Sequence, residues 1–325
     1  MVAKQARDVH AELLKPVPPS PLSAEEPVRL GLVGVGRWGK NLLRVLSSTP
    51  GAELTGVAEP RPLSPLPVPC APQLDELLAQ PSIVGLVIAT PSALHAAHAN
   101  QALVAGRHVF VEKPLAHSAA AAHALCELAA ARGLCLMVGH ILRYHPAIDE
   151  LKRRIATLGR PKRLDLVRLA GRASSEDPWW CLAPHDLSLI EHLLESPIAS
   201  VACSEANGRV VTQALSHSGV PARVEVGFGA VKQSHVEVEC EAGSARFDAS
   251  GALQIAQPGQ APRTVPSSGA EPLGIEMAHF IRCIQTGSEP LTNGLEGLRV
   301  VSALEAGDRS RRSSGRWQDV VRWPS

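Results

Sequence analysis

Two residues in this chain have the type and the setting that proton transfer at a hydroxyl group requires. Lys113 follows the apolar run HVFV in Glu-Lys-Pro, and His185 lies in the segment WWCLAPHDLS. A lysine ammonium can stabilise a developing alkoxide, and an imidazole with a pKa near neutrality can accept its proton. Lys113 could instead extend to water at the end of a strand. The pair therefore indicates either hydroxyl chemistry or two ordinary surface positions.

His185 also has a local structural explanation. Pro184 would fix the entry of the chain, and Asp186 or Ser188 would cap a helix that runs LSLIEHLLE. This explains Asp186 but not the choice of histidine before the cap. We therefore interpret His185 as a catalytic base, with a residue of the capping loop as the alternative. The histidines 140, 145 and 185 do not have metal-ligand spacing, so no metal site is predicted.

A complete G-x-G-x-x-G pattern follows the first apolar run and reads Gly34-Val35-Gly36-Arg37-Trp38-Gly39. The glycines permit a tight turn, a close approach of the backbone to a pyrophosphate, and close packing of the next helix. Glu59 ends the following strand, where a carboxylate binds ribose hydroxyls and repels a 2′-phosphate. We predict that this site prefers NAD, unless Arg61 binds the phosphate of NADP.

Ligands of open α/β sheets lie outside the carboxyl ends of the strands. That rule selects three segments, which are Thr90-Pro91-Ser92, Glu112-Lys113-Pro114 and Gly139-His140. Each follows an apolar run and presents polar groups. We expect the nicotinamide end of a cofactor to lie near these residues.

The elements that must position these residues divide the chain into two domains. From Val28 to residue 145, continuous apolar runs alternate with helical stretches that stop at Gly106 and Gly133, which is typical of a parallel sheet covered on both faces. We predict a Rossmann domain at 28–145 after a partly ordered extension at 1–27. Six prolines between residues 60 and 72 exclude a crossover helix there.

The second half has a different pattern. A helical stretch at 147–159 leads into period-two runs such as RLDLVRL, ARVEVGF and HVEVEC, and helices return after residue 271. This predicts an α/β fold with an open, mostly antiparallel sheet at 146–325, which would bind substrate. We expect this sheet to bury a polar-poor face in a homodimer or homotetramer.

Composition excludes some classes of partner. Lys and Arg total 32 and Asp and Glu total 31, without long runs of like charge, so neither nucleic acid nor a membrane surface is indicated. The seven cysteines are scattered without a C-x-x-C pair, which favours reduced thiols and a cytoplasmic location. No apolar stretch is long enough to predict a membrane span.

Six motifs occur in a consistent order from Val28 to about Arg311, and they read GVGRWGKN, ATPSALH, EKPLA, VGH, LAPHDLS and PLTNGLEGLRVVSALEA. Together they resemble the Gfo/Idh/MocA family of nicotinamide-dependent oxidoreductases. Trp38, the WW-x-LAPHDLS block and the strand VKQSHVEVE are most similar to the sugar-nucleotide branch, which includes UDP-N-acetylglucosamine 3-dehydrogenases.

The resemblance implies that Lys113 and His185 act together at the reacting hydroxyl. It also implies cofactor contacts from the matching motifs, by Thr90, Pro91, His95 and Glu112. We expect four residues to contact the hydroxyls and phosphates of a substrate, namely Arg143, Tyr144, Arg168 and Arg172. The resembled branch has an aspartate where this chain has Cys181, so His185 would lose an anionic neighbour that raises its pKa.

The sequence leaves three functions open. The first is an NAD-dependent dehydrogenase that acts on a sugar or a sugar nucleotide. The second is a dinucleotide-binding protein without catalysis, a sensor or assembly partner, which Cys181 and the missing crossover helix motivate. The third keeps hydride transfer but acts on an imine or a polyol. Substrate identity depends on loops whose shape the sequence does not reveal.

Overall fold

The computed structural model describes residues 26–61, 65–172 and 174–324, and they form two compact units. The first unit comprises the chain up to Gly139 together with Leu273–Leu298. The second comprises His140–Pro272 and the chain from Arg299 onward. The division differs from the expected ranges, because residues 273–298 return to the first unit. The expected N-terminal extension lies almost wholly outside the described residues.

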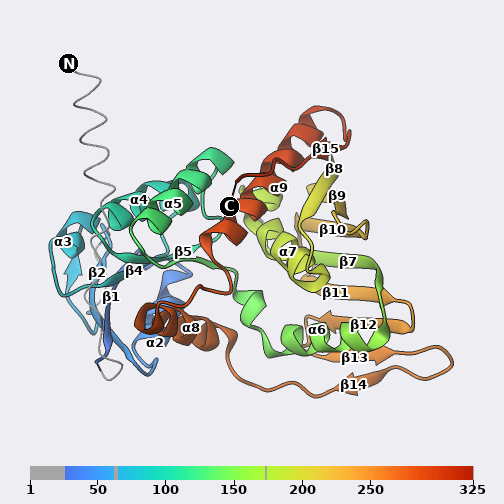
Figure 1. Ribbon diagram of the computed structural model, residues 1–325, viewed down its shortest axis with the longest axis horizontal. Coiled ribbons are helices and arrows are strands. Elements are labelled where there is room, and N and C mark those ends of the chain that lie inside the picture. The colour runs from blue at the N-terminus through green and yellow to red at the C-terminus, as the bar shows by residue number, and fades with distance from the viewer. Residues whose placement is uncertain (1–25, 62–64, 173, 325) are drawn as a thin grey trace. The chain divides into compact units, whose positions relative to one another are not determined.

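The first unit contains a six-stranded sheet in which every strand pair is parallel (Figure 1). Its order is β3-β2-β1-β4-β5-β6. The strands are β1 (Val28–Val33), β2 (Ala52–Ala58), β3 (Cys70–Ala71), β4 (Gly85–Ile88), β5 (His108–Glu112) and β6 (Leu136–Gly139). The predicted doubly wound sheet is confirmed.

Helices follow the strands as the continuous apolar runs require. They are α2 (Gly39–Leu46), α3 (Leu74–Leu78), α4 (His95–Val104), α5 (Ala119–Ala131) and, from the returning segment, α8 (Pro272–Thr286). The helices α4 and α5 are followed by Gly106 and Gly133, with φ of 74° and 62°, as expected for glycine after a helix. Phe280 of α8 packs edge-on against Phe110 of β5 with ring centroids 5.9 Å apart. The helix α8 therefore belongs to the core of the first unit.

The second unit contains a nine-stranded sheet of order β14-β13-β12-β11-β7-β10-β9-β8-β15. Its central pair, β7 with β10, is parallel, and the other pairs are antiparallel. The strands are β7 (Pro161–Ala170), β8 (Ile198–Ala206), β9 (Arg209–Ser216), β10 (Pro221–Phe228), β11 (Gln233–Cys240), β12 (Gly243–Asp248), β13 (Leu253–Ala256), β14 (Arg263–Val265) and β15 (Gln318–Asp319). The prediction of an open, mostly antiparallel sheet is confirmed.

One face of this sheet forms the core with three helices, α6 (Pro146–Leu158), α7 (Pro178–Leu194) and α9 (Gly294–Arg312). Along β7, Leu164 and Leu166 point into that core, while Asp165 between them points to the other face. This alternation is the period-two pattern of the sequence.

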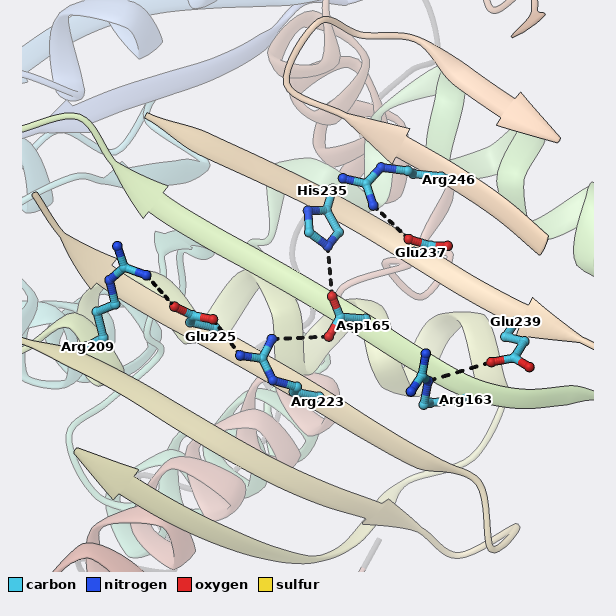
Figure 2. Close-up of polar contacts among 9 residues, drawn as sticks. All are labelled: Arg163, Asp165, Arg209, Arg223, Glu225, His235, Glu237, Glu239 and Arg246. Atoms are coloured by element: carbon cyan, nitrogen blue, oxygen red, sulfur yellow. Dashed lines mark hydrogen bonds and ion pairs between the residues drawn. The ribbon is translucent and has the colours of Figure 1, made fainter. Parts of the chain in front are cut away.

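The face opposite the core carries a network of ion pairs (Figure 2). Asp165 accepts hydrogen bonds from Arg223 on one side, at 3.2 Å, and contacts His235 on the other, at 2.8 Å. Arg223 also binds Glu225, which binds Arg209 at 2.8 Å. The expectation of a polar-poor face on this sheet is wrong, because the outward positions of five adjacent strands carry charged groups, which compensate one another.

No crossover helix joins β2 to β3 in the described residues 59–61 and 65–69, as the prolines predicted. All seven cysteines are free. Within the described part of the chain, no helix combines the length and the apolarity needed to span a membrane.

Candidate functional site

The glycine loop between β1 and α2 has the geometry that its spacing predicts. Gly34 has φ of +90°, and a Cβ there would lie 2.8 Å from the carbonyl oxygen of Ala89. A Cβ at Gly39 would overlap the carbonyl oxygen of Gly34. A Cβ at Gly36 would first meet the tip of Arg61, at 3.9 Å. The loop is therefore tightly packed at its two ends and open at Gly36, as the approach of a pyrophosphate requires.

The N-terminal end of α2 is also suited to bind an anion. Its N-cap residue is Trp38, and within the described chain no side chain caps the helix. The first N–H groups of a helix have no intrahelical partner, and the helix dipole favours negative charge there. Phosphate oxygens can satisfy such donors. The residues present therefore fit the diphosphate of a dinucleotide.

Glu59 follows β2 and lies beside this loop, where its carboxylate is already engaged. It accepts the Val35 N–H at 2.9 Å and two hydrogen bonds from the Arg61 guanidinium, at 2.7 and 3.0 Å. The Arg61 hydrogen bond is the main reason that the pKa of Glu59 falls to about 2, and the Val35 bond adds to it against the effect of burial. Glu59 is thus a buried anion, while the Arg61 side chain is 66% exposed. Arg61 neutralises the carboxylate that we expected to select NAD.

The end of β5 places Glu112 and Lys113 at the carboxyl edge of the same sheet. The Glu112 carboxylate accepts a hydrogen bond from the Trp38 indole N–H and another, at 3.2 Å, from the backbone N–H of Lys113. Glu112 therefore connects the glycine loop to the turn that carries Lys113. The Lys113 side chain is half-buried, and the following peptide bond to Pro114 is cis.

His95 has a different position from the one we predicted. It is 1% exposed, and its two ring nitrogens lie 2.8 Å from the carbonyl oxygen of Pro114 and 2.9 Å from that of Thr90. This burial leaves the ring little surface for a cofactor. His95 instead joins two loops at the strand ends, the Thr90-Pro91-Ser92 segment and the turn after Lys113.

In the second unit, His185 lies in the interior of a helix. The helix α7 begins at Pro178 and is capped by Asp177, whose side chain accepts the Trp179 N–H at 2.9 Å. The expectation of a helix that starts at a cap of Asp186 or Ser188 is wrong, because Asp177-Pro178 supplies the start signal, with a cap nine residues before Asp186. Pro184 lies within the helix, where it cannot donate a backbone hydrogen bond.

Two tryptophans hold α7 against α9. The indole N–H of Trp179 donates to the carbonyl oxygen of Leu304, and that of Trp180 donates to Asp308, both at 2.9 Å. Trp179 is fully buried and fills the space that a side chain at Gly307 would occupy. The face of α7 that carries His185 is thereby fixed within its own unit.

Cys181 lies one helical turn before His185, and both are half-buried. The sulfur of Cys181 is 3.7 Å from Oε2 of Glu176, whose carboxylate also accepts hydrogen bonds from Ser174 at 3.1 Å and Arg172 at 3.3 Å. Glu176 was not among the residues predicted from the sequence. A carboxylate thus lies next to Cys181, although position 181 itself has none.

The four residues predicted to bind substrate have different surroundings. Arg168 makes two hydrogen bonds to Asp186, at 2.7 and 3.0 Å, and Asp186 is completely buried. Arg172 binds Glu176 and lies over the ring of Phe228, at 5.0 Å. Tyr144 is 7% exposed, and Arg143 beside it is half-buried. Arg168 is therefore a structural partner of Asp186, and its contact with substrate stays a prediction.

The described residues contain no cluster of three or more His, Cys, Asp or Glu side chains arranged to hold a metal ion. The chemistry that these groups can support is binding of a dinucleotide by the first unit, with a lysine at its strand ends. The second unit adds a histidine on a fixed helix.

Comparison with known proteins identifies the family. Residues 28–140 match the Gfo/Idh/MocA model of an oxidoreductase family with an NAD-binding Rossmann fold. YceM of Salmonella typhimurium, an oxidoreductase by its name, is 30% identical over 309 residues, which are 85% of this chain and 97% of YceM. The chain belongs to the Gfo/Idh/MocA oxidoreductase family.

Within the Gfo/Idh/MocA family, the chain is similar to UDP-N-acetylglucosamine 3-dehydrogenase of Acidithiobacillus ferrooxidans. The sequences are 34% identical over 171 residues, so the match covers 50% of this chain and about half, 53%, of that relative. A solved structure of that enzyme, GnnA, superimposes with a TM-score of 0.81 at 25% identity, over 89% of this chain and 99% of that one. The scyllo-inositol 2-dehydrogenase (NAD(+)) of Bacillus subtilis is 26% identical over 84% of this chain and 90% of that relative.

Proposed function

We propose that this protein is an NAD-dependent dehydrogenase that transfers a hydride between the nicotinamide and a hydroxyl-bearing carbon of a sugar nucleotide. The observation that carries the proposal is the Glu112 carboxylate, which bonds to both Trp38 in the glycine loop and the backbone of Lys113. Through it, the dinucleotide loop fixes the turn that carries a lysine able to bind a reacting oxygen. The likeness to GnnA over 89% of the chain supports a sugar-nucleotide substrate.

The residues of the chain have separate roles in this proposal. The open backbone at Gly36 and the uncapped start of α2 bind the diphosphate. Glu59 is the proposed contact for the adenosine ribose, where a carboxylate disfavours a 2′-phosphate. Because Arg61 is paired with this carboxylate, the preference for NAD over NADP should be modest. Thr90 and Pro91 border the cofactor at the adjacent strand end. Bound NAD supplies the hydride acceptor.

The proton and the substrate oxygen are assigned to Lys113 and His185, the pair that the family resemblance implies. Lys113 holds the substrate oxygen and stabilises its developing negative charge. His185 accepts the hydroxyl proton. Arg172, positioned by Glu176 and Phe228, is the proposed contact for a substrate phosphate, because guanidinium groups bind phosphate oxygens in pairs. Arg143 and Tyr144 are proposed contacts for the substrate's hydroxyls.

The decisive experiment combines binding and turnover. Calorimetric titration with NAD(H), NADP(H) and a panel of UDP-sugars should show tighter binding of NAD(H) and should identify a UDP-sugar ligand. Lys113→Ala should then abolish turnover while its affinity for NAD stays within a few-fold. Lys162→Ala, at an exposed lysine of β7, is the matched control and should leave both unchanged. Surviving turnover in Lys113→Ala would show that the lysine is structural.

The alternative functions predict other outcomes of the same experiment. A protein that binds NAD without oxidising any hydroxyl substrate would be the non-catalytic dinucleotide-binding protein. Turnover of an imine or a polyol without affinity for UDP-sugars would keep hydride transfer and change the substrate class. We favour the sugar nucleotide because the alignment with GnnA covers both units.

A further inference from the structure

A buried carboxyl group in the first unit has no role in the site described so far. Glu276 lies on α8 with 0% of its surface exposed. Neither of its carboxyl oxygens has a hydrogen-bond partner among the described residues. Its neighbours along the buried face of α8 are apolar and include Leu273, Met277 and Phe280. An ionised carboxylate in such surroundings is strongly disfavoured, so the group should hold its proton.

The packing of α8 brings Glu276 near a carboxyl group of the sheet. Glu276 lies one turn before Phe280, whose ring packs against that of Phe110 of β5 with centroids 5.9 Å apart. Glu112 follows Phe110 by two residues on the same side of that strand. Burial is the main cause that raises the pKa of Glu276 well above its usual range, and the negative charge of Glu112 adds to it. The other ionisable side chains of α8 are His279, Arg282 and Cys283, and His279 contacts the other two at 3.3 and 3.5 Å. A negative charge on one carboxyl group makes ionisation of a neighbouring one less favourable.

Glu112 has little freedom to move away from a second negative charge. It is 8% exposed, and a Cβ at Gly139 on the adjacent strand would lie 3.0 Å from its carboxyl carbon. Its two oxygens accept the hydrogen bonds from Trp38 and from the backbone of Lys113. Repulsion from an ionised Glu276 would therefore act directly on these two bonds.

We propose that Glu276 is a positioning residue of the cofactor site, a neutral acid on the buried face of α8 that lets Glu112 keep its hydrogen bonds to Trp38 and Lys113. Ionisation of Glu276 would weaken both bonds and so loosen the contact between the glycine loop and the lysine turn. The proposal concerns the dinucleotide half of the proposed active site. It can be tested without any substrate.

The first prediction concerns stability and has a definite sign. A carboxyl group whose pKa is higher in the folded than in the unfolded state makes the folded protein bind more protons, so stability falls as pH rises above the unfolded value of 4.5. Glu276→Gln removes this loss and keeps a neutral group of similar size. The unfolding constant of the wild type, divided by that of the variant, should grow up to about tenfold per pH unit above pH 4.5.

Urea unfolding at pH 4, 6 and 8 measures this ratio, with the pH 4 value as the reference. Glu76→Gln makes the same chemical replacement at an exposed carboxylate on α3 of the same unit. Its ratio should stay nearly constant with pH, because an exposed carboxylate has a similar pKa in the folded and unfolded states. A constant ratio for Glu276→Gln as well would overturn the proposal. A ratio that falls with pH would also overturn it, because Glu276 would then act as an anion.

Infrared spectroscopy provides a test that does not depend on folding of the variant. The wild type at pH 7 should show the carbonyl band of a protonated, solvent-shielded carboxylic acid. The band should disappear in Glu276→Gln if that variant folds, and its absence from the wild type would refute the neutral acid.

Binding of NADH distinguishes a positioning role from a merely structural one. In the wild type, the dissociation constant for NADH should rise with pH over the range in which the infrared band of the protonated acid disappears, whereas in Glu276→Gln it should stay within about twofold over that range. A rise of equal size in both proteins, or none in either, would remove the positioning role. The titrations of the wild type and of Glu276→Gln both use NADH without a substrate. Failure of the sugar-nucleotide proposal would therefore not change how they are interpreted.

Discussion

Replacement of Arg168 by methionine should destabilise the second unit strongly. The guanidinium makes two charge-assisted hydrogen bonds to Asp186, at 2.7 and 3.0 Å, and Asp186 is 0% exposed. Each hydrogen bond to a charged group contributes about 1.5–3 kcal/mol. Removing one partner leaves a buried, unpaired carboxylate, and breaking such pairs typically costs about 3–5 kcal/mol. We therefore expect Arg168→Met to lower the free energy of unfolding by about 4 kcal/mol.

Urea unfolding followed by tryptophan fluorescence measures this loss, because Trp179 and Trp180 lie on the same helix as Asp186. The double variant Arg168→Met, Asp186→Leu removes both charges and should recover most of the stability, since an apolar pair of similar size replaces a buried ion pair at little cost. Arg172→Met is the control, because Glu176, its carboxylate partner, is exposed. A loss below about 1 kcal/mol in Arg168→Met, together with a raised KM, would refute the structural role and restore Arg168 as a substrate contact.

Three further predictions follow from the site. Arg61→Ala should increase the preference for NAD over NADP several-fold in binding titrations, because it removes a cation that could hold the 2′-phosphate and leaves the Glu59 carboxylate unopposed; an unchanged ratio would contradict this. The pKa of Glu59 is lowered to about 2, so its stabilising effect is present above pH 4.5 and is lost as pH falls toward 2. The advantage of the wild type over Glu59→Gln in urea unfolding should therefore shrink across that window, by less than roughly 3 kcal/mol since water screens Arg61. Cys181→Asp should raise turnover by roughly tenfold to thousandfold relative to the wild type and to Cys181→Asn, as an anion one turn away makes His185 a stronger base; loss of an existing activity would instead assign the thiol to the chemistry.

The first unit was predictable because its signals are local. Continuous apolar runs, glycines at fixed offsets and an acid at a strand end all lie within 32 residues of one another, from Val28 to Glu59. Their geometry follows from the strand, turn and helix that they specify. The engagement of Glu59 by Arg61 was less predictable, because the sequence places an arginine nearby without showing which group it contacts.

The second unit was less predictable because its important contacts join distant segments. Two start signals for a helix flank this part of the chain, Asp177-Pro178 and Pro184 with Asp186 around His185. The sequence alone favoured the second, which is wrong. Trp179 reaches α9, 125 residues away, and this packing decides where α7 lies. The strands β8 and β9 were not anticipated, although their residues alternate between buried and exposed.

The burial of Glu276 could not be predicted from the sequence for a third reason. Its sequence context, GIEMAHFI, is an ordinary amphipathic helix in which a glutamate would be expected to face water. The apolar residues on both sides of it were the available signal. Only the docking of α8 on the sheet reveals that the glutamate is on the buried face.

The return of α8 to the first unit has a consequence for synthesis on the ribosome. The six strands of the parallel sheet are complete at Gly139, but the segment that covers part of this core, including Phe280, is translated more than 130 residues later. At about 5–20 residues per second, the nascent sheet waits several seconds or more with that apolar surface uncovered. Chaperones can bind the chain during this interval. For the same reason, a truncated protein that ends near residue 140 should aggregate, whereas one in which residues 273–298 are joined to it by a short linker should remain in solution.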